Sequence, residues 1–347
     1  MNILLYGAYG YTGRRIADLA KKRGVELILA GRNDSKLRDH FDADNNQLRA
    51  FSLDESEDIC SNLQDVDVVL HAAGPFEQTA QPMVDACLKT KTHYLDITGE
   101  ITVFEELKLM DNEAKNAEIM LLPGAGFDVV PTDMIARKLS KMLPDATHLE
   151  LAFAPINSQI SHGTLTTMIK QLGESGASRY DGEIVQEPIG KSGKWIDFKI
   201  KKRFTMTIPW GDVSTAHWST KIPNIKVFTS VSPSFFKLMK AQFLVNPLLK
   251  MDVTKNLLQK WVDSNVDGPD DKTIEEAYTL VKGTVWNSSG DTQTIMLRCP
   301  ESYTLTAETA LRMAERTANE EFKTGYQTPA TAYDFSLLTD IDGVEII

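Results

Sequence analysis

Cysteine is scarce in this sequence of 347 residues, because only Cys60, Cys87 and Cys299 occur and they are far apart. An odd, scattered set does not form the framework of a disulfide-rich secreted protein, so reduced thiols are expected. No apolar stretch approaches the length of a membrane span, and no signal peptide precedes the first predicted strand at Asn2. We therefore expect a cytoplasmic protein without a membrane partner.

Several kinds of catalytic site are also missing. The six histidines are scattered, without a His-x-x-x-His or Cys-x-x-Cys pair, so no metal site is predicted. Neither G-x-S-x-G nor G-x-x-x-x-G-K-[ST] occurs, which excludes the nucleophile elbow and the Walker-type phosphate loop. The net charge of −11 argues against nucleic acid or an anionic membrane as the main partner, and the run Lys199–Arg203 is interpreted as a solvated strand edge.

The most informative stretch that is present is Ile3–Gly13, which reads ILLYGAYGYTG. A short apolar run breaks into glycines spaced G-x-x-G-x-x-G, and a helical pattern follows. A strand that becomes a helix in this way can bring backbone N–H groups and the helix N-terminus against a pyrophosphate. The predicted dinucleotide-binding residues are Gly7, Tyr9, Gly10, Tyr11, Thr12 and Gly13. The alternative is a plain glycine turn.

The first 131 residues alternate short apolar runs with helical segments. Strands are predicted at 3–5, 26–30, 47–51, 67–72, 93–97 and 119–122, and helices at 81–90 and 104–117. Such alternation implies crossover connections, so we predict an α/β protein with an N-terminal Rossmann-type doubly wound parallel sheet. Turn residues follow each strand, and ligands of such sheets bind along the shared carboxyl edge. The turns therefore point to a single cleft.

The pattern changes after about residue 131, where a further helix is predicted at 132–142. Strands are predicted at 149–154, 194–203, 205–208, 226–230, 272–286 and 292–298, and helices at 235–262 and 304–321. We therefore predict a Rossmann domain at 1–131 and a second, α+β domain with an open mixed sheet at 132–301. The helices of about 302–347 are expected to pack back on the first domain. The glycine-rich segment 173–193 is expected to act as a lid.

Arg32 follows the second predicted strand, about 20 residues after the glycines, where NAD enzymes usually carry an acid. A guanidinium can bind the 2′-phosphate of NADP through two hydrogen bonds. With Asn33 and Ser35 close behind it, Arg32 favours NADP over NAD. The alternative is that Arg32 is a solvated turn residue and that Asp34 holds the ribose of NAD. Asp54 is a candidate for the adenine amino group, or simply an acid in a surface turn.

The later turns are predicted to let the backbone approach the ribose and the nicotinamide. Their candidate contacts are Ala73, Gly74 and Pro75, then Gly99, then Gly126, Phe127 and Asp128. Phe127 would cover one face of the nicotinamide ring, and Asp128 would accept a hydrogen bond from its carboxamide. The alternative for this last turn is a strand–helix junction with a cap at Thr132 or Asp133.

Three residues are candidates for proton transfer. His71 has a suitable unperturbed pKa, although a histidine on a buried strand is more often structural. Asp96 and Glu100 bring two carboxylates to the same edge, where they could hold a basic substrate nitrogen or shuttle a proton. Alternatively, Glu100 complements the N-terminus of the helix that follows it.

The first domain contains, in order, G-A-Y-G-Y-T-G-R at 7–14, A-G-R at 30–32, A-A-G-P-F at 72–76, Y-L-D-I-T-G-E at 94–100 and P-G-A-G-F-D-V-V-P-T-D at 123–133. Together these segments resemble the saccharopine dehydrogenase-like oxidoreductases, including the trans-acting enoyl reductase group. Tyr9 stands where that family commonly has Thr. Looser matches follow at 162–164, 179–182 and 209–212. The resemblance implies an NADP-binding Rossmann domain and a second domain that often supports dimerisation, so a homodimer is expected.

Motifs and resemblance together predict an NADP-dependent oxidoreductase that transfers hydride to or from a small molecule between its two domains. An imine, a secondary amine or an enoyl group is the candidate substrate. The alternative is a non-catalytic NADP(H)-binding sensor or partner protein, because no Tyr-x-x-x-Lys motif or obvious His–Asp pair is present.

Overall fold

The computed structural model describes residues 2–44, 46–159, 165–166, 169, 173–240, 246, 251–265 and 276–347. Contacts divide the chain into two compact units. Unit 1 comprises Met1–Met134 and Tyr303–Ile341, and unit 2 comprises Ile135–Ser302 and Asp342–Ile347. The chain therefore leaves the first unit and returns to it near its end.

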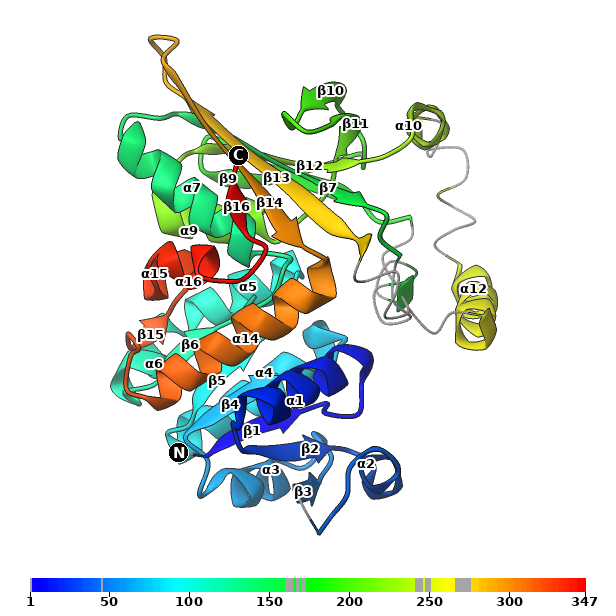
Figure 1. Ribbon diagram of the computed structural model, residues 1–347, viewed down its shortest axis with the longest axis vertical. Coiled ribbons are helices and arrows are strands. Elements are labelled where there is room, and N and C mark those ends of the chain that lie inside the picture. Colours follow the sequence, from blue (N-terminus) through cyan, green and yellow to red (C-terminus); the bar gives the residue numbers. More distant parts are fainter. Residues whose placement is uncertain are drawn as a thin grey trace. The chain divides into compact units, whose positions relative to one another are not determined.

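Unit 1 is built on a parallel sheet of seven strands in the order β15-β6-β5-β4-β1-β2-β3 (Figure 1). The strands are β1 (Ile3–Tyr6), β2 (Leu27–Gly31), β3 (Gln47–Ala50), β4 (Val68–His71), β5 (His93–Asp96), β6 (Met120–Leu122) and β15 (Gly325–Tyr326). The central strands are mostly apolar and buried, as expected where helices cover both faces of a sheet. The predicted Rossmann-type doubly wound sheet is confirmed, and β15 adds an edge strand that we did not predict.

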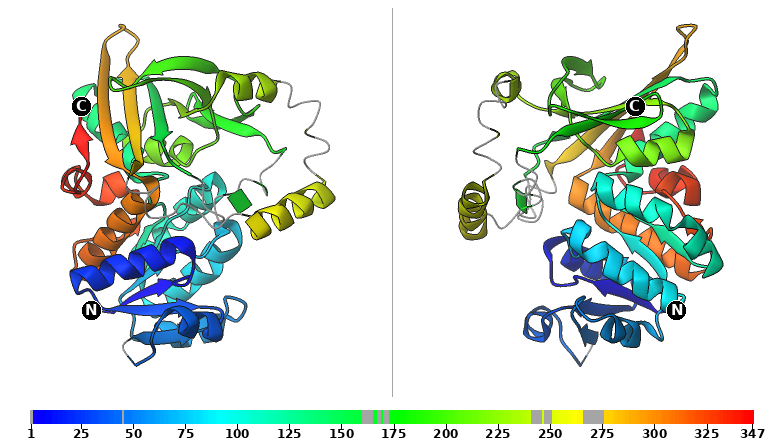
Figure 2. Two further views of the ribbon diagram at one scale, coloured as in Figure 1. Left: turned by 45° about the vertical axis from the view of Figure 1, so that its right-hand side comes forward. Right: turned by 180° about the vertical axis from the view of Figure 1, so that it is seen from behind.

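Helices lie on both faces of this sheet (Figures 1 and 2). The helices described in this unit are α1 (Tyr11–Arg23), α2 (Asp34–His40), α3 (Ser56–Leu63), α4 (Phe76–Thr90), α5 (Ile101–Leu109), α6 (Asp111–Asn116), α14 (Ser302–Ala318), α15 (Pro329–Ala332) and α16 (Ser336–Thr339). α4 begins five residues before the predicted helix at 81–90. The helix predicted at 104–117 is divided at Met110 into α5 and α6, because the backbone there leaves the helical conformation.

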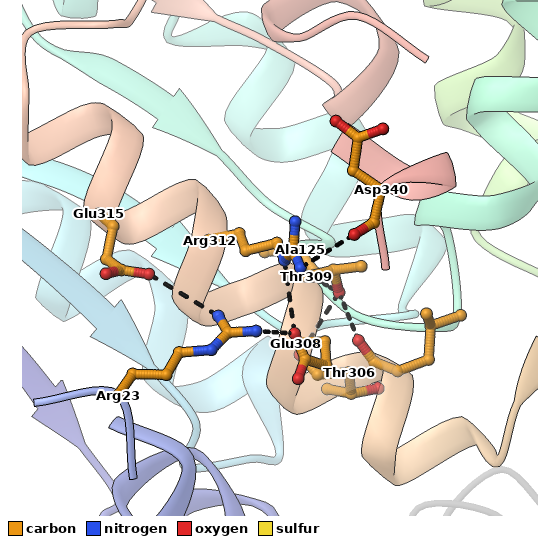
Figure 3. Close-up of polar contacts among 9 residues, drawn as sticks. Arg23, Ala125, Thr306, Glu308, Thr309, Arg312, Glu315 and Asp340 are labelled. Carbon is orange, nitrogen blue, oxygen red and sulfur yellow. Dashed lines mark hydrogen bonds and ion pairs between the residues drawn. The ribbon is translucent and has the colours of Figure 1, made fainter. Parts of the chain in front are cut away.

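Helix α14 contacts α1 and the turn after β6, which are both in unit 1 (Figure 3). The guanidinium of Arg23 on α1 forms ion pairs with Glu308 and, at 3.9 Å, with Glu315. The hydroxyl of Thr309 donates to the carbonyl oxygen of Ala125 at 2.7 Å. Residues 303–341 thus belong to the first unit, whereas the last six residues, which we expected there too, belong to unit 2.

In the part of unit 2 that the structure describes, nine strands form a mixed sheet (Figure 2). They are β7 (His148–Ile156), β8 (Gly176–Tyr180), β9 (Glu183–Glu187), β10 (Gly193–Asp197), β11 (Lys202–Thr207), β12 (Asn224–Ser230), β13 (Tyr278–Trp286), β14 (Thr292–Pro300) and β16 (Glu345–Ile346). β12 runs parallel to β7, and the other pairs are antiparallel. The predicted second domain with an open mixed sheet is confirmed.

Each face of the second sheet is covered differently. Helices α7 (Val130–Met142) and α9 (Asp212–Thr220) are joined where Arg137 donates to the carbonyl oxygen of Ser219. A Cβ added to Gly283 of β13 would collide with Ile135 of α7, so this face of the sheet lies directly under the helix. On the other face, Ile196 and Phe198 from the β10–β11 hairpin join an apolar cluster with β7, β12 and β13.

Three predictions for unit 2 need correction. The single strand expected at 194–203 is instead part of the β10–β11 hairpin, because the chain reverses after Phe198. The turn was not predicted because it contains no glycine or proline. The expected lid at 173–193 contains the β8–β9 hairpin, which pairs with β12 and is part of the sheet. The helix expected at 235–262 corresponds to α10 (Pro233–Lys240) and α12 (Asp252–Asn265). Positions 241–245 and 247–250, and the looser family match at 162–164, lie outside the described residues.

Candidate nucleotide site

The turn after β1 packs closely against the ends of β2 and β4. Gly7 has a φ of +86°, and a Cβ added to it would lie 2.8 Å from both the carbonyl carbon of Ala72 and the Cβ of Ala73. The N–H of Gly7 donates to the carbonyl oxygen of Ala30 at 2.8 Å. The strand order reverses at β1 and β4, and doubly wound sheets bind their ligands at this point of reversal.

The other two glycines of the motif shape the start of α1. A Cβ on Gly13 would collide with the carbonyl oxygen of Gly7, so only glycine permits this close packing. Around a Cβ on Gly10, by contrast, only the Gly7 carbonyl oxygen lies within 4 Å among the described residues, at 3.2 Å. Gly10 is the N-cap of α1, no side chain caps that helix, and its first turn has no acidic residue. This open, uncapped helix start suits a pyrophosphate.

The end of β2 presents a tyrosine ring and cationic side chains. The ring of Tyr9 crosses Gly31, with its Cε1 2.6 Å from the position of an added Cβ. The ammonium of Lys36 lies 5.9 Å from the centroid of that ring. Arg32 is exposed, and it makes no hydrogen bond or ion pair within the described part of the chain. Its guanidinium is therefore available to an anion.

The other candidates near β2 and β3 have local structural contacts. Asn33 caps α2 through its Oδ1, which accepts from the N–H of Lys36 at 3.0 Å and from the hydroxyl of Ser35 at 2.7 Å. Asp54 is exposed and accepts a hydrogen bond from Ser52. Asp54 thus lies in a surface turn, which agrees with the alternative interpretation given for it above.

Asp96, at the end of β5, is completely buried and its oxygens are occupied. Its Oδ1 accepts from the N–H groups of Thr98 and Gly124, each at 2.9 Å. Its Oδ2 accepts from the hydroxyl of Tyr94 at 2.8 Å. Burial raises the pKa of Asp96 to about 7, although the N–H donors favour its charged form. These bonds tie the turn after β5 to the turn after β6.

Glu100 has a comparable structural role. Its carboxylate accepts from the backbone N–H groups of Phe76 at 3.2 Å and Glu77 at 2.7 Å, the first residues of α4. The alternative interpretation had Glu100 complement the helix that follows it in sequence, but these two bonds are to the N-terminus of α4. This contact explains the early start of α4, and it joins the turn after β5 to the turn after β4.

Asp128 differs from these two carboxylates. Its Oδ2 lies 2.5 Å from the position that a Cβ would take on Gly99, so the turns after β5 and β6 are in direct contact. The side chain is half-buried, and it has no hydrogen bond or ion pair with any described residue. Burial and the nearby charge of Glu100 raise the pKa of Asp128 to about 7. The carboxyl group of Asp128 is therefore partly protonated near neutral pH, and it has no hydrogen-bond partner among the described residues.

His71 lies inside unit 1, on β4. Its Nε2 hydrogen-bonds with the hydroxyl of Thr79 at 3.0 Å, and its Nδ1 is buried without a partner among the described residues. Burial lowers the pKa of His71 to about 3, so the ring is neutral at physiological pH. Packing against Tyr6 and Phe76 encloses it further. This geometry matches the structural alternative for His71.

The remaining candidates lie at the same edge. Ala73 and Pro75 are half-buried, Gly74 is exposed, and Phe127 is largely buried. The N–H of Phe127 donates to the hydroxyl of Thr306 on α14 at 3.0 Å, and Gly126 lies against the same threonine. Sequence reasoning missed Thr306, because no motif links a residue of the C-terminal helix to a turn 179 positions earlier.

Comparison with known families agrees with this geometry. Residues 3–122, which contain β1 to β6, match the family model described as the saccharopine dehydrogenase NADP binding domain. The N-terminal third of the chain is thus similar to the NADP-binding domain of that family. The resemblance inferred from the motifs is thereby confirmed.

Two curated relatives match part of this chain. The lipid droplet localized protein of Caenorhabditis elegans is 25% identical over 196 residues, covering 51% of this chain and 46% of that protein. The trans-acting enoyl reductase of Mycobacterium leprae is 28% identical over 155 residues, covering 42% and 37%. The match thus spans less than half the length of either relative.

Two solved structures share the fold over the whole chain. Saccharopine dehydrogenase (L-Glu forming) from Saccharomyces cerevisiae aligns with a TM-score of 0.69 at 13% identity, covering 100% of this chain and 98% of that one. Homospermidine synthase from Legionella pneumophila, in complex with NAD, aligns with a TM-score of 0.66 at 9% identity, covering 100% and 91%. At these identities the likeness concerns the fold alone.

Proposed function

We propose that this protein is an NADP(H)-dependent oxidoreductase that transfers hydride to or from a small molecule. The proposal rests on the turns after β1, β2, β4, β5 and β6, which contact one another along one edge of the sheet. Gly10 and the uncapped start of α1 would hold the pyrophosphate. The bound cofactor would supply the hydride, and the protein would position the reactants.

Arg32 supports the choice of NADP over NAD, because it directly follows β2 and its exposed guanidinium has no hydrogen-bond or ion-pair partner among the described residues. Titration with NADPH and NADH tests this choice. We expect Arg32→Ala to lower NADPH affinity by about 30-fold, since a charge-assisted hydrogen bond contributes about 2 kcal/mol. NADH affinity should not change. Arg38→Ala, which removes an exposed guanidinium from α2, the helix that follows Arg32, is the control. Equal affinity of the wild type for both cofactors would contradict the proposal.

Asp128 is the carboxyl group that we propose as the proton partner, in place of Asp96 and Glu100. Those two acids are occupied by backbone N–H groups, whereas Asp128 has no partner among the described residues. A group with a pKa of about 7 can donate a proton in reduction below that pH. We therefore expect the wild-type rate of reduction to fall above pH 7. Asp128→Asn should be slower, without that fall. An unchanged pH profile in the variant would exclude the role.

The substrate class that we propose is an imine, a secondary amine or an enoyl group. Similarity to a trans-acting enoyl reductase supports the last of these. A panel of imines, ketones and enoyl thioesters, assayed by NADPH consumption, distinguishes the classes. The predictions of a homodimer, of a cytoplasmic location and of substrate binding between the domains stay predictions.

A non-catalytic sensor is the second candidate function. It is favoured by the structural contacts of Asp96 and Glu100 and by the low pKa of buried His71, which leave few groups for proton transfer. Saturable NADPH binding without NADPH consumption across the whole panel would favour the sensor over the enzyme.

A further inference from the structure

The outer face of the β10–β11 hairpin and the adjoining helix α10 expose apolar side chains among lysines. Of the apolar side chains, Trp195 is 56% exposed, Ile200 47%, Phe235 44% and Leu238 65%. Among the exposed lysines of the same elements are Lys199, Lys201, Lys202 and Lys237. Lys240 is exposed too, but its ammonium donates to the carbonyl oxygen of Lys191 at 2.7 Å, so it is left out of the set. We call the other eight residues the basic apolar surface.

Packing connects the two elements that carry this surface. Trp195 and Phe204 are directly opposite in the β10–β11 pair, so they share a face, and their ring centroids are 5.6 Å apart. Phe204 contacts Phe236 of α10 with a centroid separation of 5.1 Å. A Cβ on Gly193 would lie 2.6 Å from the Phe236 ring. α10 is therefore seated on the same face of the hairpin as Trp195.

The hairpin already has a separate buried face. Ile196 and Phe198 point into the apolar cluster of unit 2 and are 8% and 0% exposed. The inner side of α10 is likewise occupied, since Phe236 and Met239 lie against Gly190, in the turn before β10. The exposed Trp195, Phe235 and Leu238 are thus additional to the side chains that hold these elements together. Such a cluster of exposed apolar residues is typical of an interaction site.

The charge of the surface is opposite to that of the chain as a whole. Residues 191–203 contain six basic side chains and one acidic side chain, although the net charge of the protein is −11. The ammonium groups of Lys199, Lys201 and Lys202 form no ion pair or hydrogen bond with the described residues. An anionic partner could therefore approach them without displacing an internal acid.

We propose that the basic apolar surface binds the headgroup region of membranes that contain anionic phospholipid. Trp is favoured at the membrane interface, and lysines beside exposed apolar side chains are typical of elements that lie on anionic membranes. Protein interfaces are instead depleted in Lys and enriched in Arg, and nucleic-acid phosphates are bound best by the Arg fork. The four cations here are all lysines, which favours lipid over these two partners.

Sedimentation of the full chain with phosphatidylcholine vesicles, with or without about 30% phosphatidylserine, tests the proposal. We expect binding to the anionic vesicles alone, and its loss when salt rises from about 0.05 to 0.5 M. Lys201→Gln with Lys202→Gln should weaken binding by about 30-fold, equivalent to about 2 kcal/mol. The control is Lys21→Gln with Lys22→Gln, which removes the same charge from an exposed position on α1 and should bind as the wild type does.

A second measurement tests the apolar part of the surface. Anionic vesicles should shift the tryptophan emission of the wild type to shorter wavelength, and Trp195→Phe should lose that shift while still sedimenting. Leu238→Ser should weaken binding, whereas Leu109→Ser, at an exposed position of unit 1, should not. Absence of binding to anionic vesicles, or equal binding by the double-lysine variant, would overturn the proposal. Displacement of the vesicles by a single-stranded oligonucleotide at equal phosphate concentration would also overturn it.

Discussion

The carboxyl edge of the parallel sheet in unit 1 and the β10–β11 hairpin in unit 2 both carry charged residues, but in different surroundings. Asp96 and Glu100 are buried, and their oxygens accept hydrogen bonds from backbone N–H groups. Lys201 and Lys202 are exposed and have no ion pair with the described residues. Buried, bonded charges hold the turns together and contribute to stability, whereas exposed lysines contribute little to stability and are available to a partner.

This difference shows how little a net charge says about one surface. Our expectation that the protein lacks a membrane partner depended partly on the total of −11, in which the acids of the whole chain outweigh the local lysines. No helix in the described ranges is both long and apolar enough to cross a bilayer. Binding of a membrane surface needs no such helix, only exposed apolar side chains beside cations.

The largest expected effect is on the buried side of the comparison. Asp96→Ala removes the acceptor from three donors at once, the N–H groups of Thr98 and Gly124 and the hydroxyl of Tyr94. Because each buried donor left without a partner costs about 1–3 kcal/mol, we expect a loss of about 4 kcal/mol in the free energy of unfolding. Urea denaturation measures it. Asp39→Ala, on the exposed side of α2, should change stability by less than about 0.5 kcal/mol. Similar losses of unfolding free energy in Asp96→Ala and Asp39→Ala would contradict the difference between buried and exposed charges.

His71 provides a pH test within the same buried region. Its folded-state pKa of about 3 is below the unfolded value near 6.5, so between these values the unfolded chain binds the extra proton. The contribution of neutral, buried His71 to the free energy of unfolding is fully present above pH 6.5, and it is lost as the pH falls toward 3. Relative to His71→Gln, the wild type should lose about 2 kcal/mol between pH 7 and 4.5. The raised pKa of Asp96 makes stability rise as the pH falls, but it does so equally in the wild type and in His71→Gln, so it cancels in the comparison. Parallel stability curves would show that His71 is accessible to protons.

The smallest effect is expected on the exposed side. Lys201→Gln with Lys202→Gln should change the free energy of unfolding by less than about 0.5 kcal/mol, because neither ammonium has an ion-pair partner in the described structure. Urea denaturation of the variant checks this. A loss of more than about 1 kcal/mol would mean that these lysines stabilise the fold.

The sequence was most informative where the backbone itself sets the requirement. Gly7 and Gly13 could be predicted as turn and packing residues, because their neighbours exclude any Cβ. The roles of Asp96 and Glu100 in joining turns could not be predicted. Gly124, which donates to Asp96, lies 28 positions away, the donors to Glu100 lie 23–24 positions away, and both contacts depend on the sheet order. The β10–β11 turn was missed for a different reason: its residues, Phe198 to Lys201, include no glycine or proline.

The Gly10→Ala variant tests the central claim most directly. Gly10 has a φ of −69°, and open space surrounds its missing Cβ except toward the Gly7 carbonyl oxygen, so the fold should tolerate alanine. We expect a stability within about 1 kcal/mol of the wild type, as for other N-cap changes, and an NADPH affinity at least about 100-fold lower, because the methyl group occupies the pyrophosphate position. A folded Gly10→Ala protein that binds NADPH as tightly as the wild type would contradict the proposed nucleotide site.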